Sequence, residues 1–384
     1  MKLIREYEGV LLKRLQEKSP LIQVLIGPRQ VGKTTAAQSI HEQWNDAKVL
    51  ISADSPTPPT SDWIKWNWEK ALSLGPNTLF IIDEVQKVSG WSEQVKLLFD
   101  KERGKGNLKI LLLGSSSLYL QKGLTESLAG RFELVKATHW TFNECEKCFG
   151  WNFDKYLVYG GYPGAAEFTG DFSRWRSYIL NSIVEPVLSR DILGNQMVAN
   201  PALFRQAFEM IMSYPAQVVS YQKLLGQIQD RGNAATIKNY LNLFEKSFLI
   251  LCLEKYSGSH LKIKSSSPKV IVLNPALISA YQPEGRLATD SKWYGHVFES
   301  IVGAHLSWKE NNDLYYWKSG NFEVDYVIKR PNETVAIEIK SGQHKDGRGL
   351  REFSKIYPFA RCELWDKEEC LKFFAEQIHH YSLE

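Results

Sequence analysis

The stretch Leu21–Thr35 constrains the fold of this chain more than any other. It reads LIQVLIGPRQVGKTT, in which the apolar run Val24–Ile26 leads into the pattern Gly-x-x-x-x-Gly-Lys-Thr. A buried strand, a glycine-rich turn and a helix N-terminus in this order are typical of a phosphate-binding loop. Glycines let the backbone curl so that successive N–H groups converge on phosphates. The sequence therefore predicts an α/β fold with a nucleotide site at this loop.

The residues of the motif have distinct expected roles. Lys33 is expected to reach the β- and γ-phosphates, and the Thr34 hydroxyl is expected to ligate Mg²⁺. The alternative, a glycine turn before a basic helix, leaves the preceding apolar strand unexplained. We expect the nucleotide to be held by Gly27, Pro28, Arg29, Gln30, Val31, Gly32, Lys33, Thr34 and Thr35.

A second apolar run, Thr78–Ile82, ends in Asp83 and Glu84. After a phosphate loop, such an acidic pair is expected to complete a site that hydrolyses nucleotides. Asp83 would hold Mg²⁺ through water, and Glu84 would orient or deprotonate the attacking water. A strand end that simply meets solvent is the alternative interpretation.

A third buried strand, Lys109–Leu113, is followed by Gly114 and two serines. A polar residue here could touch the γ-phosphate or the attacking water, so Ser115 and Ser116 are both candidates for a catalytic role. The helical stretches Trp91–Lys101 and Leu118–Ala129 give the alternation of strand and helix that builds a parallel sheet. Ligands of such sheets lie at the carboxyl ends of the strands, where Lys33, Asp83 and Ser115 all fall.

Arg131 follows the second of these helical stretches in the sequence SLAGR. An arginine here could act as an arginine finger, either on its own nucleotide or on that of a neighbouring subunit. A solvated surface arginine is the alternative, since such charges usually face water.

Composition limits the classes of protein that this chain can belong to. Its 384 residues are enough for two or three domains, and the net charge of +4 permits nucleic-acid binding without demanding it. Five scattered cysteines fit a reducing cytoplasm, and a charged N-terminus without an apolar core is not a signal peptide. No apolar run is long enough for a membrane span, so we expect a cytoplasmic protein with no membrane partner. The pair Cys145 and Cys148, with His139 nearby, is weak evidence for zinc and favours two ordinary cysteines.

The region 201–275 has the pattern of a winged helix-turn-helix. Residues Tyr221–Ile228 show one apolar helical face with Ser220 as N-cap, and the next helix is expected to bury Ile237, Tyr240, Leu241, Phe244 and Phe248. Its exposed face offers Lys238, Asn239, Asn242, Glu245 and Lys246, and the segment His260–Lys264 could form a basic wing. Lysine and asparagine suit contacts with DNA phosphates and bases. A module that packs against protein is the alternative.

The C-terminal region carries a third set of polar residues on two expected strands, Phe322–Arg330 and Thr334–Ser341. Strand periodicity puts Glu323 and Asp325 on the face away from the apolar residues of the first strand, and Glu338 and Lys340 away from those of the second. Asp325 and Glu338 could ligate Mg²⁺, and Lys340 could position or activate a hydrolytic water. Alternating charges on the solvated face of a hairpin are the alternative.

Several segments together resemble one protein family. GPRQVGKTT, LFIIDEVQKVSGW, LLLGSSSLYL, SLAGR, YLVYGGYPGAAEF and LSRDIL are similar, in this order, to the AAA-type bacterial and archaeal ATPases that carry a DUF4143 region. The resemblance implies ATP rather than GTP, and a RecA/AAA-like P-loop core over residues 1–140. It further implies a helical extension at 141–200, a winged helix at 201–275 and a DUF4143 domain at 276–384 that is similar to PD-(D/E)xK nucleases.

The same resemblance supplies expected roles for single residues. Lys33 and Thr34 bind phosphate and Mg²⁺, Asp83 and Glu84 act as the acidic pair of the hydrolytic site, and Arg131 is the arginine-finger candidate. The nuclease likeness adds Glu299, on the helix Trp293–Leu306, to Asp325, Glu338 and Lys340.

Two functional hypotheses follow from these patterns. The first is a DNA-acting enzyme in which ATP gates a C-terminal nuclease. The second is a nucleotide-dependent switch that binds DNA or protein and uses the nuclease-like region as a scaffold. A protein that binds ATP and hydrolyses it only negligibly is a third option. Each is compatible with a homo-oligomer.

Overall fold

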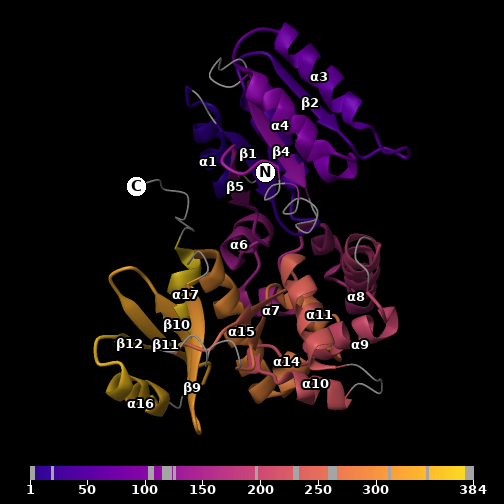
Figure 1. Cartoon of the computed structure of the whole chain (residues 1–384). Coiled ribbons are helices and arrows are strands. Elements are labelled where there is room, and N and C mark those ends of the chain that lie inside the picture. Colours follow the sequence, from indigo (N-terminus) through magenta and orange to yellow (C-terminus); the bar gives the residue numbers. More distant parts are fainter. Residues whose placement is uncertain are drawn as a thin grey trace. The chain divides into compact units, whose positions relative to one another are not determined.

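The computed structural model describes residues 5–18, 21–102, 108–114, 123, 127–194, 198–227, 233–257, 266–309, 313–342 and 346–376. The chain divides into two compact units, the first ending at Thr138 and the second beginning at His139 (Figure 1). No helix among the described residues is long and apolar enough to cross a membrane.

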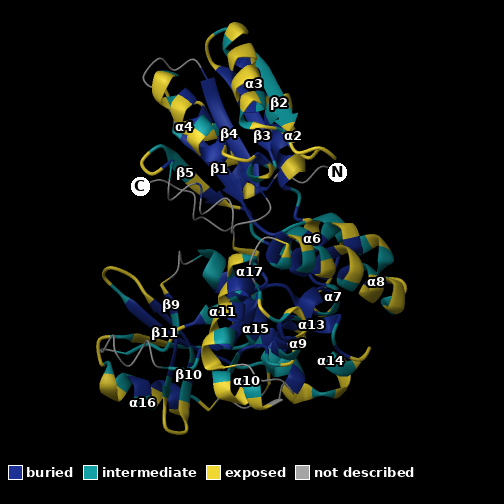
Figure 2. Cartoon of the chain, turned by 45° about the vertical axis from the view of Figure 1, so that its right-hand side comes forward, coloured by how far each residue is buried: buried dark blue, intermediate teal, exposed yellow. Residues whose placement is uncertain are grey.

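The first unit is built on a five-stranded sheet with the order β2-β3-β4-β1-β5. Every pairing in it is parallel. The strands are β1 (Ile22–Ile26), β2 (Lys48–Ser52), β3 (Thr78–Asp83), β4 (Leu108–Gly114) and β5 (Phe132–Lys136). The strands β1, β3 and β4 are buried along their whole length (Figure 2). This continuous burial explains their mostly apolar sequences, because a parallel sheet is covered on both faces.

Helices alternate with the strands up to β4, as the sequence predicts, and most of the expected helix Leu118–Ala129 lies outside the described residues. They are α1 (Glu6–Leu15), α2 (Lys33–Gln43), α3 (Ser61–Ser73) and α4 (Trp91–Glu102). Helix α1 contacts α2, and α3 contacts α4. Helix α3 was not expected, because it follows a proline-rich loop; it begins after Thr60 and buries Ile64, Trp68 and Ala71. The α/β P-loop architecture is thus confirmed.

The second unit opens with helices. They are α6 (Phe142–Phe149), α7 (Phe153–Tyr159), a 3₁₀ segment (Pro163–Phe168), α8 (Phe172–Tyr178) and two π-helical segments (Ile179–Val184 and Val187–Leu193). Gly161 is required where this region turns, because a Cβ there would lie 2.1 Å from the carbonyl oxygen of Trp140. The five cysteines, all among the described residues, form no disulfide with one another. His139 is hydrogen-bonded to Asn274 and to the Phe248 carbonyl, so both of its ring nitrogens are in use. Cys145, Cys148 and His139 therefore do not form a zinc site.

A small three-stranded antiparallel sheet follows, with the order β6-β8-β7. The elements are, in chain order, α9 (Pro201–Ile211), β6 (Gln217–Val218), α10 (Tyr221–Gln227), α11 (Ala234–Lys246), β7 (Ile250–Leu253) and β8 (Lys269–Val272). The expected cap of α10 is present, since the Ser220 hydroxyl accepts the Lys223 amide at 3.1 Å. Phe248 lies beyond the end of α11 and is half-buried, with a positive φ of 60°, so its expected place on the buried helical face is wrong.

The last part of the chain surrounds a four-stranded sheet with the order β12-β11-β10-β9. After α13 (Pro275–Ser279) and α14 (Arg286–Thr289), its elements are α15 (Ser291–Lys309), β9 (Leu314–Ser319), β10 (Phe322–Lys329), β11 (Thr334–Ile339), α16 (Arg348–Ile356), β12 (Arg361–Trp365) and α17 (Lys367–Ala375). The strands β10 and β11 form the expected antiparallel hairpin, and β12 joins β11 in parallel.

Candidate functional site

The loop Gly27–Gly32 leaves β1 at the carboxyl edge of the parallel sheet and ends at the first residue of α2. Two of its residues, Gln30 and Gly32, have positive φ values of 61° and 93°, which curl the backbone into a compact turn. Gly27 is required for a different reason. A Cβ on Gly27 would lie only 2.3 Å from the carbonyl oxygen of Ala137, so this position excludes any side chain.

The Lys33 side chain lies inside this loop and is only 7% exposed. Its ammonium donates to the carbonyl oxygens of Gly27 at 3.0 Å and Pro28 at 2.6 Å. A positive charge is thereby fixed next to the helix N-terminus, where the helix dipole also favours an anion. The loop can therefore bind a phosphate with both backbone and side-chain donors.

Thr34 and Asp83 meet at the same edge of the sheet. The Thr34 hydroxyl Oγ1 donates to the Asp83 carboxylate Oδ2 at 2.7 Å, and the Glu84 amide donates to Oδ1 at 2.9 Å. Asp83 ends β3, whereas Thr34 lies in α2, which follows β1. Strand β4 lies between β1 and β3 in the sheet, so the contact connects two strands that are not neighbours. The structure thus brings together two residues that lie 49 positions apart in the sequence.

Glu84 adopts the left-handed backbone conformation, with φ 53° and ψ 37°. This conformation is costly for a residue with a side chain, and such strain is concentrated at functional sites. The Glu84 carboxylate Oε2 accepts a hydrogen bond from Gln86 at 2.6 Å. A carboxylate fixed in this way beside Asp83 is suited to orienting a water molecule.

The donors at this edge fit a magnesium ion. A threonine hydroxyl and an aspartate carboxylate are oxygen ligands of the kind that Mg²⁺ selects when it also binds substrate phosphates. Asp83 is 6% exposed, and both of its oxygens are held by Thr34 and by the backbone, so its orientation is fixed.

Arg5 is a contact of the loop that the sequence did not indicate. Its buried guanidinium donates to the Val31 carbonyl at 3.1 Å through Nη1, and to the Thr138 carbonyl and hydroxyl at 3.2 and 3.1 Å through Nη2. Arg5 precedes α1, so the start of this helix is joined to the phosphate loop and to the chain after β5. No local pattern marks this residue, because its partners lie 26 and 133 positions away.

Strand β4 ends at Gly114, between β1 and β3. The catalytic candidates Ser115 and Ser116 lie outside the described residues.

Arg131 lies at the amino-terminal ends of the strands, whereas the phosphate loop lies at their carboxyl ends. It immediately precedes β5, whose first residue pairs with Ile22 at the start of β1, and its carbonyl accepts the Ile22 amide. A five-residue strand spans about 16 Å, so the structure does not bring Arg131 to the loop of its own chain. Its guanidinium forms a two-pronged pair with Asp100, at 2.7 and 2.9 Å.

The C-terminal carboxylates meet a lysine from another sheet. Lys269, the first residue of β8, is fully buried, and its ammonium lies 2.5 Å from Glu299, 3.3 Å from Glu323 and 3.4 Å from Asp325. Burial would lower the pKa of Lys269, but the charges of Glu299 and Asp325 raise it above the usual value. Burial also raises the pKa of Glu299, to about 8, with a further contribution from Asp325.

Glu338 and Lys340 pair with each other, at 2.6 Å. Burial would lower the pKa of Lys340, but its hydrogen bond with Glu338 and the nearby carboxylates raise it. A permanently charged ammonium can position a water molecule but does not accept its proton. Asp325 is joined to the same strand, because its Oδ2 accepts the Ile339 amide at 2.7 Å.

This carboxylate cluster (Glu299, Glu323, Asp325 and Glu338) does not fit a divalent metal ion. Three of the four carboxylates contact Lys269, and one oxygen of Asp325 is committed to the backbone. Among the described residues, no group of three or more histidine, cysteine or acidic side chains is arranged to hold a metal.

The exposed face of α11 carries Lys238, Asn239, Asn242 and Lys246. Glu245, expected on this face, is instead half-buried and accepts the Cys252 amide of β7 at 2.9 Å, so the prediction of its exposure was wrong. Burial raises its pKa. The face lines a hollow of about 680 Å³. The expected wing, including His260, Lys262 and Lys264, lies outside the described residues.

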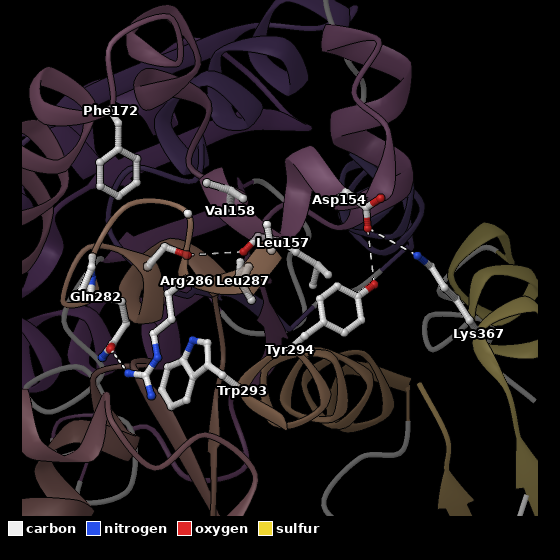
Figure 3. A pocket seen from close by; sticks show the side chains of 14 residues that line it. Asp154, Leu157, Val158, Phe172, Gln282, Arg286, Leu287, Trp293, Tyr294 and Lys367 are labelled. Carbon is white, nitrogen blue, oxygen red and sulfur yellow. Dashed lines mark hydrogen bonds and ion pairs between the residues drawn. The ribbon is translucent and has the colours of Figure 1, made fainter. Parts of the chain in front are cut away.

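The second unit also contains an apolar pocket of about 420 Å³ between α7, α13, α14 and α15. Tyr294 and Lys367 both reach the Asp154 carboxylate at one end, at 3.3 and 3.4 Å (Figure 3). At the other end, Arg286 lies 4.0 Å over the Trp293 ring and donates to Gln282. The charged groups of this pocket are thus paired with protein groups, and they indicate no particular ligand.

Three parts of the chain match known protein families. Residues 19–146 match an AAA domain, residues 150–286 match a domain of unknown function named DUF8612, and residues 294–378 match the domain of unknown function DUF4143. An uncharacterised protein of Mycobacterium tuberculosis is 26% identical over 340 residues, which cover 86% of this chain and 72% of the relative. One of Methanocaldococcus jannaschii is 24% identical over 362 residues, 87% of this chain and 78% of the relative.

Among solved structures, the Holliday junction branch migration motor RuvB of Thermotoga maritima is similar, with 16% identity and a TM-score of 0.35. The matched region covers 64% of this chain and 87% of that structure.

Proposed function

We propose that this chain, an AAA-type P-loop protein with a C-terminal DUF4143 domain, binds ATP with Mg²⁺ and hydrolyses it at the carboxyl edge of its parallel sheet. The observation that carries the proposal is the 2.7 Å contact between the Thr34 hydroxyl and the Asp83 carboxylate. It joins the phosphate loop to the acidic strand end, which is the pairing that a magnesium–nucleotide site requires.

Each residue of the site has a separate task in this proposal. The loop amides and Lys33 bind and orient the phosphates, and Thr34 and Asp83 would hold the magnesium ion. The bound ion would neutralise charge on the β- and γ-phosphates. Glu84 orients the attacking water and accepts its proton. Phosphoryl transfer depends mainly on positioning and charge neutralisation, which these few residues can supply.

Binding of a fluorescent ATP analogue and release of phosphate test this proposal, each with Mg²⁺ and with a chelator. Lys33→Ala removes the ammonium at the loop and is expected to abolish both signals. Lys87→Ala is the matched control, because Lys87 also follows a strand of this sheet, β3, but pairs with the exposed Asp54 at 2.5 Å. Equal binding by wild type and Lys33→Ala would refute the proposed site.

A second candidate function is contact with DNA through α11. The order α9, β6, α10, α11, β7, β8 is that of a winged helix-turn-helix, with α11 in the place of the recognition helix. Burial of Glu245 leaves two lysines and two asparagines on the exposed face, and these side chains suit phosphate and base edges.

Duplex binding measured by fluorescence anisotropy at two salt concentrations tests this contact. Lys238→Glu is expected to weaken binding about tenfold and to reduce its dependence on salt. Lys223→Glu, an exposed charge change on α10, is the control. Equal affinity of the two variants would exclude α11 as the contact.

For the C-terminal region we propose the scaffold role and not DNA cleavage. The nuclease likeness is supported by the position of Asp325 beside the strand of Glu338 and Lys340. The chemistry, however, needs a divalent metal, and the carboxylate cluster faces an ammonium instead. Cleavage of DNA that disappears in Asp325→Ala would contradict the scaffold role.

A further inference from the structure

We propose that Lys269 is the resident cation of the carboxylate cluster, and that it joins the sheet β6-β8-β7 to the DUF4143 domain in the place where a nuclease would hold a metal ion. This inference rests on the scaffold role proposed above and is independent of ATP hydrolysis.

The geometry around Lys269 is that of a central ion with several ligands. Its ammonium lies within 3.4 Å of three carboxylates that come from α15 and β10. It also faces the ring of Tyr326, 5.3 Å from its centre, and its side chain has no exposed surface.

The remaining charges of the cluster are paired on its outer side. Lys318 lies 2.9 Å from Glu323, and Lys340 lies 2.6 Å from Glu338. Three ammonium groups thus meet four acidic side chains, one of which, Glu299, has a raised pKa, so most of the negative charge is neutralised without a metal.

The energetics follow from burial. A buried ammonium without carboxylates is strongly unfavourable, and so is a group of buried carboxylates without a cation. Removing one partner therefore costs far more than removing two opposite charges together. The stability of single and double variants therefore distinguishes an ionic contact from ordinary packing of the aliphatic part of the Lys269 side chain.

The position of Lys269 connects the carboxylate cluster to the proposed DNA-contacting helix. Strand β8 is the central strand of the small sheet, and its neighbour β7 packs against α11. The cluster thereby attaches the sheet that supports the proposed DNA-contacting helix to α15 and to the hairpin β10–β11. A displacement of the hairpin would be transmitted to that sheet.

Thermal unfolding of the full chain without nucleotide tests this ionic contact. Lys269→Met is expected to lower the melting temperature of the second unit by about 10 °C. The double variant Lys269→Met with Glu299→Gln is expected to recover part of this loss. Lys329→Met, at an exposed position of β10, is the control and should leave the melting temperature unchanged. No loss in Lys269→Met, or no recovery in the double variant, would overturn the proposed ionic contact.

Binding of Mn²⁺, measured by electron paramagnetic resonance on nucleotide-free protein, gives a second readout that holds even if Lys269→Met does not fold. Wild type and Asp325→Asn are expected to bind the same amount of Mn²⁺. Extra Mn²⁺ bound by wild type and lost in Asp325→Asn would show that a metal occupies the cluster, and would overturn the proposal. ATP turnover, measured separately, is not affected by either outcome.

Discussion

The Thr34 hydroxyl donates a 2.7 Å hydrogen bond to the Asp83 carboxylate, from the first turn of α2 to the carboxyl end of β3. The two residues belong to strand–helix units that are separated in the sheet by β4. Their contact fixes the relative position of the phosphate loop and the acidic pair, which have to act on the same phosphate group.

Asp83→Asn tests the acidic half of this contact. The substitution preserves the size of a buried side chain and removes its charge, so the fold should be retained while magnesium–nucleotide binding weakens. We expect turnover to fall by about a hundredfold or more. Steady-state hydrolysis over a range of Mg²⁺ concentrations measures this effect. Asp54→Asn is the control, because Asp54 follows the neighbouring strand but is exposed; a similar loss in both variants would speak against the assignment.

Arg5→Ala tests the support of the phosphate loop by the N-terminal helix. The variant loses the donors to Val31 and Thr138 and leaves their carbonyls without these bonds. We expect the first unit to lose about 2–4 kcal/mol of unfolding free energy, and nucleotide affinity to fall with it. Denaturant unfolding with and without nucleotide measures both effects. Lys13→Ala, an exposed change on the same helix, should alter neither.

We propose that Arg131 acts on the nucleotide of a neighbouring subunit, because it precedes β5 at the amino-terminal ends of the strands, away from the phosphate loop of its own chain. We therefore expect Arg131→Ala to bind nucleotide normally and to turn it over slowly. Mixing it with Lys33→Ala should restore part of the turnover, since each variant supplies what the other lacks. Phosphate release by the two variants, alone and mixed, measures this complementation. Full activity of Arg131→Ala alone would show that Arg131 takes no part in hydrolysis.

His305 makes the second unit sensitive to acid. The side chain is fully buried, and burial lowers its pKa to about 3, with the charge of Lys309 acting in the same direction and its hydrogen bond to Ile301 opposing it. The unfolded chain has a histidine pKa of about 6.5. Between these values the unfolded state binds more protons, so stability is lost as the pH falls through 6.5 toward 3.

Because of His305, the free energy of unfolding should be about 2 kcal/mol lower at pH 5 than at pH 7. His305→Phe keeps the contacts with the surrounding rings and removes the titration. Unfolding free energies at pH 7 and pH 5 should therefore differ less in His305→Phe than in wild type. An unchanged difference between the two pH values would show that another group is responsible.

The sequence predicted most of the first unit because its signals are local. Helix α4 and the strands β1, β3 and β4 were expected within a residue or two of their bounds. Strand β5 was missed because it is only partly buried and its sequence, Phe132–Lys136, is not apolar throughout.

The residues that the sequence did not indicate act across long separations. Arg5 contacts Val31 and Thr138, and Lys269 contacts carboxylates that lie 30 or more positions later. No sequence pattern connects a lysine at the start of an apolar strand with acidic residues that lie far away in the chain. The hairpin β10–β11 was predicted, whereas the cation that neutralises it could be found only from the fold.

The most direct test of the central claim is the turnover of ATP by wild type and Glu84→Gln under saturating Mg²⁺. The account predicts that both proteins bind ATP with similar affinity and that Glu84→Gln is slower by about a hundredfold or more, because it cannot accept the proton of the attacking water. Wild type that binds ATP without measurable turnover, or a Glu84→Gln variant as fast as wild type, would contradict it.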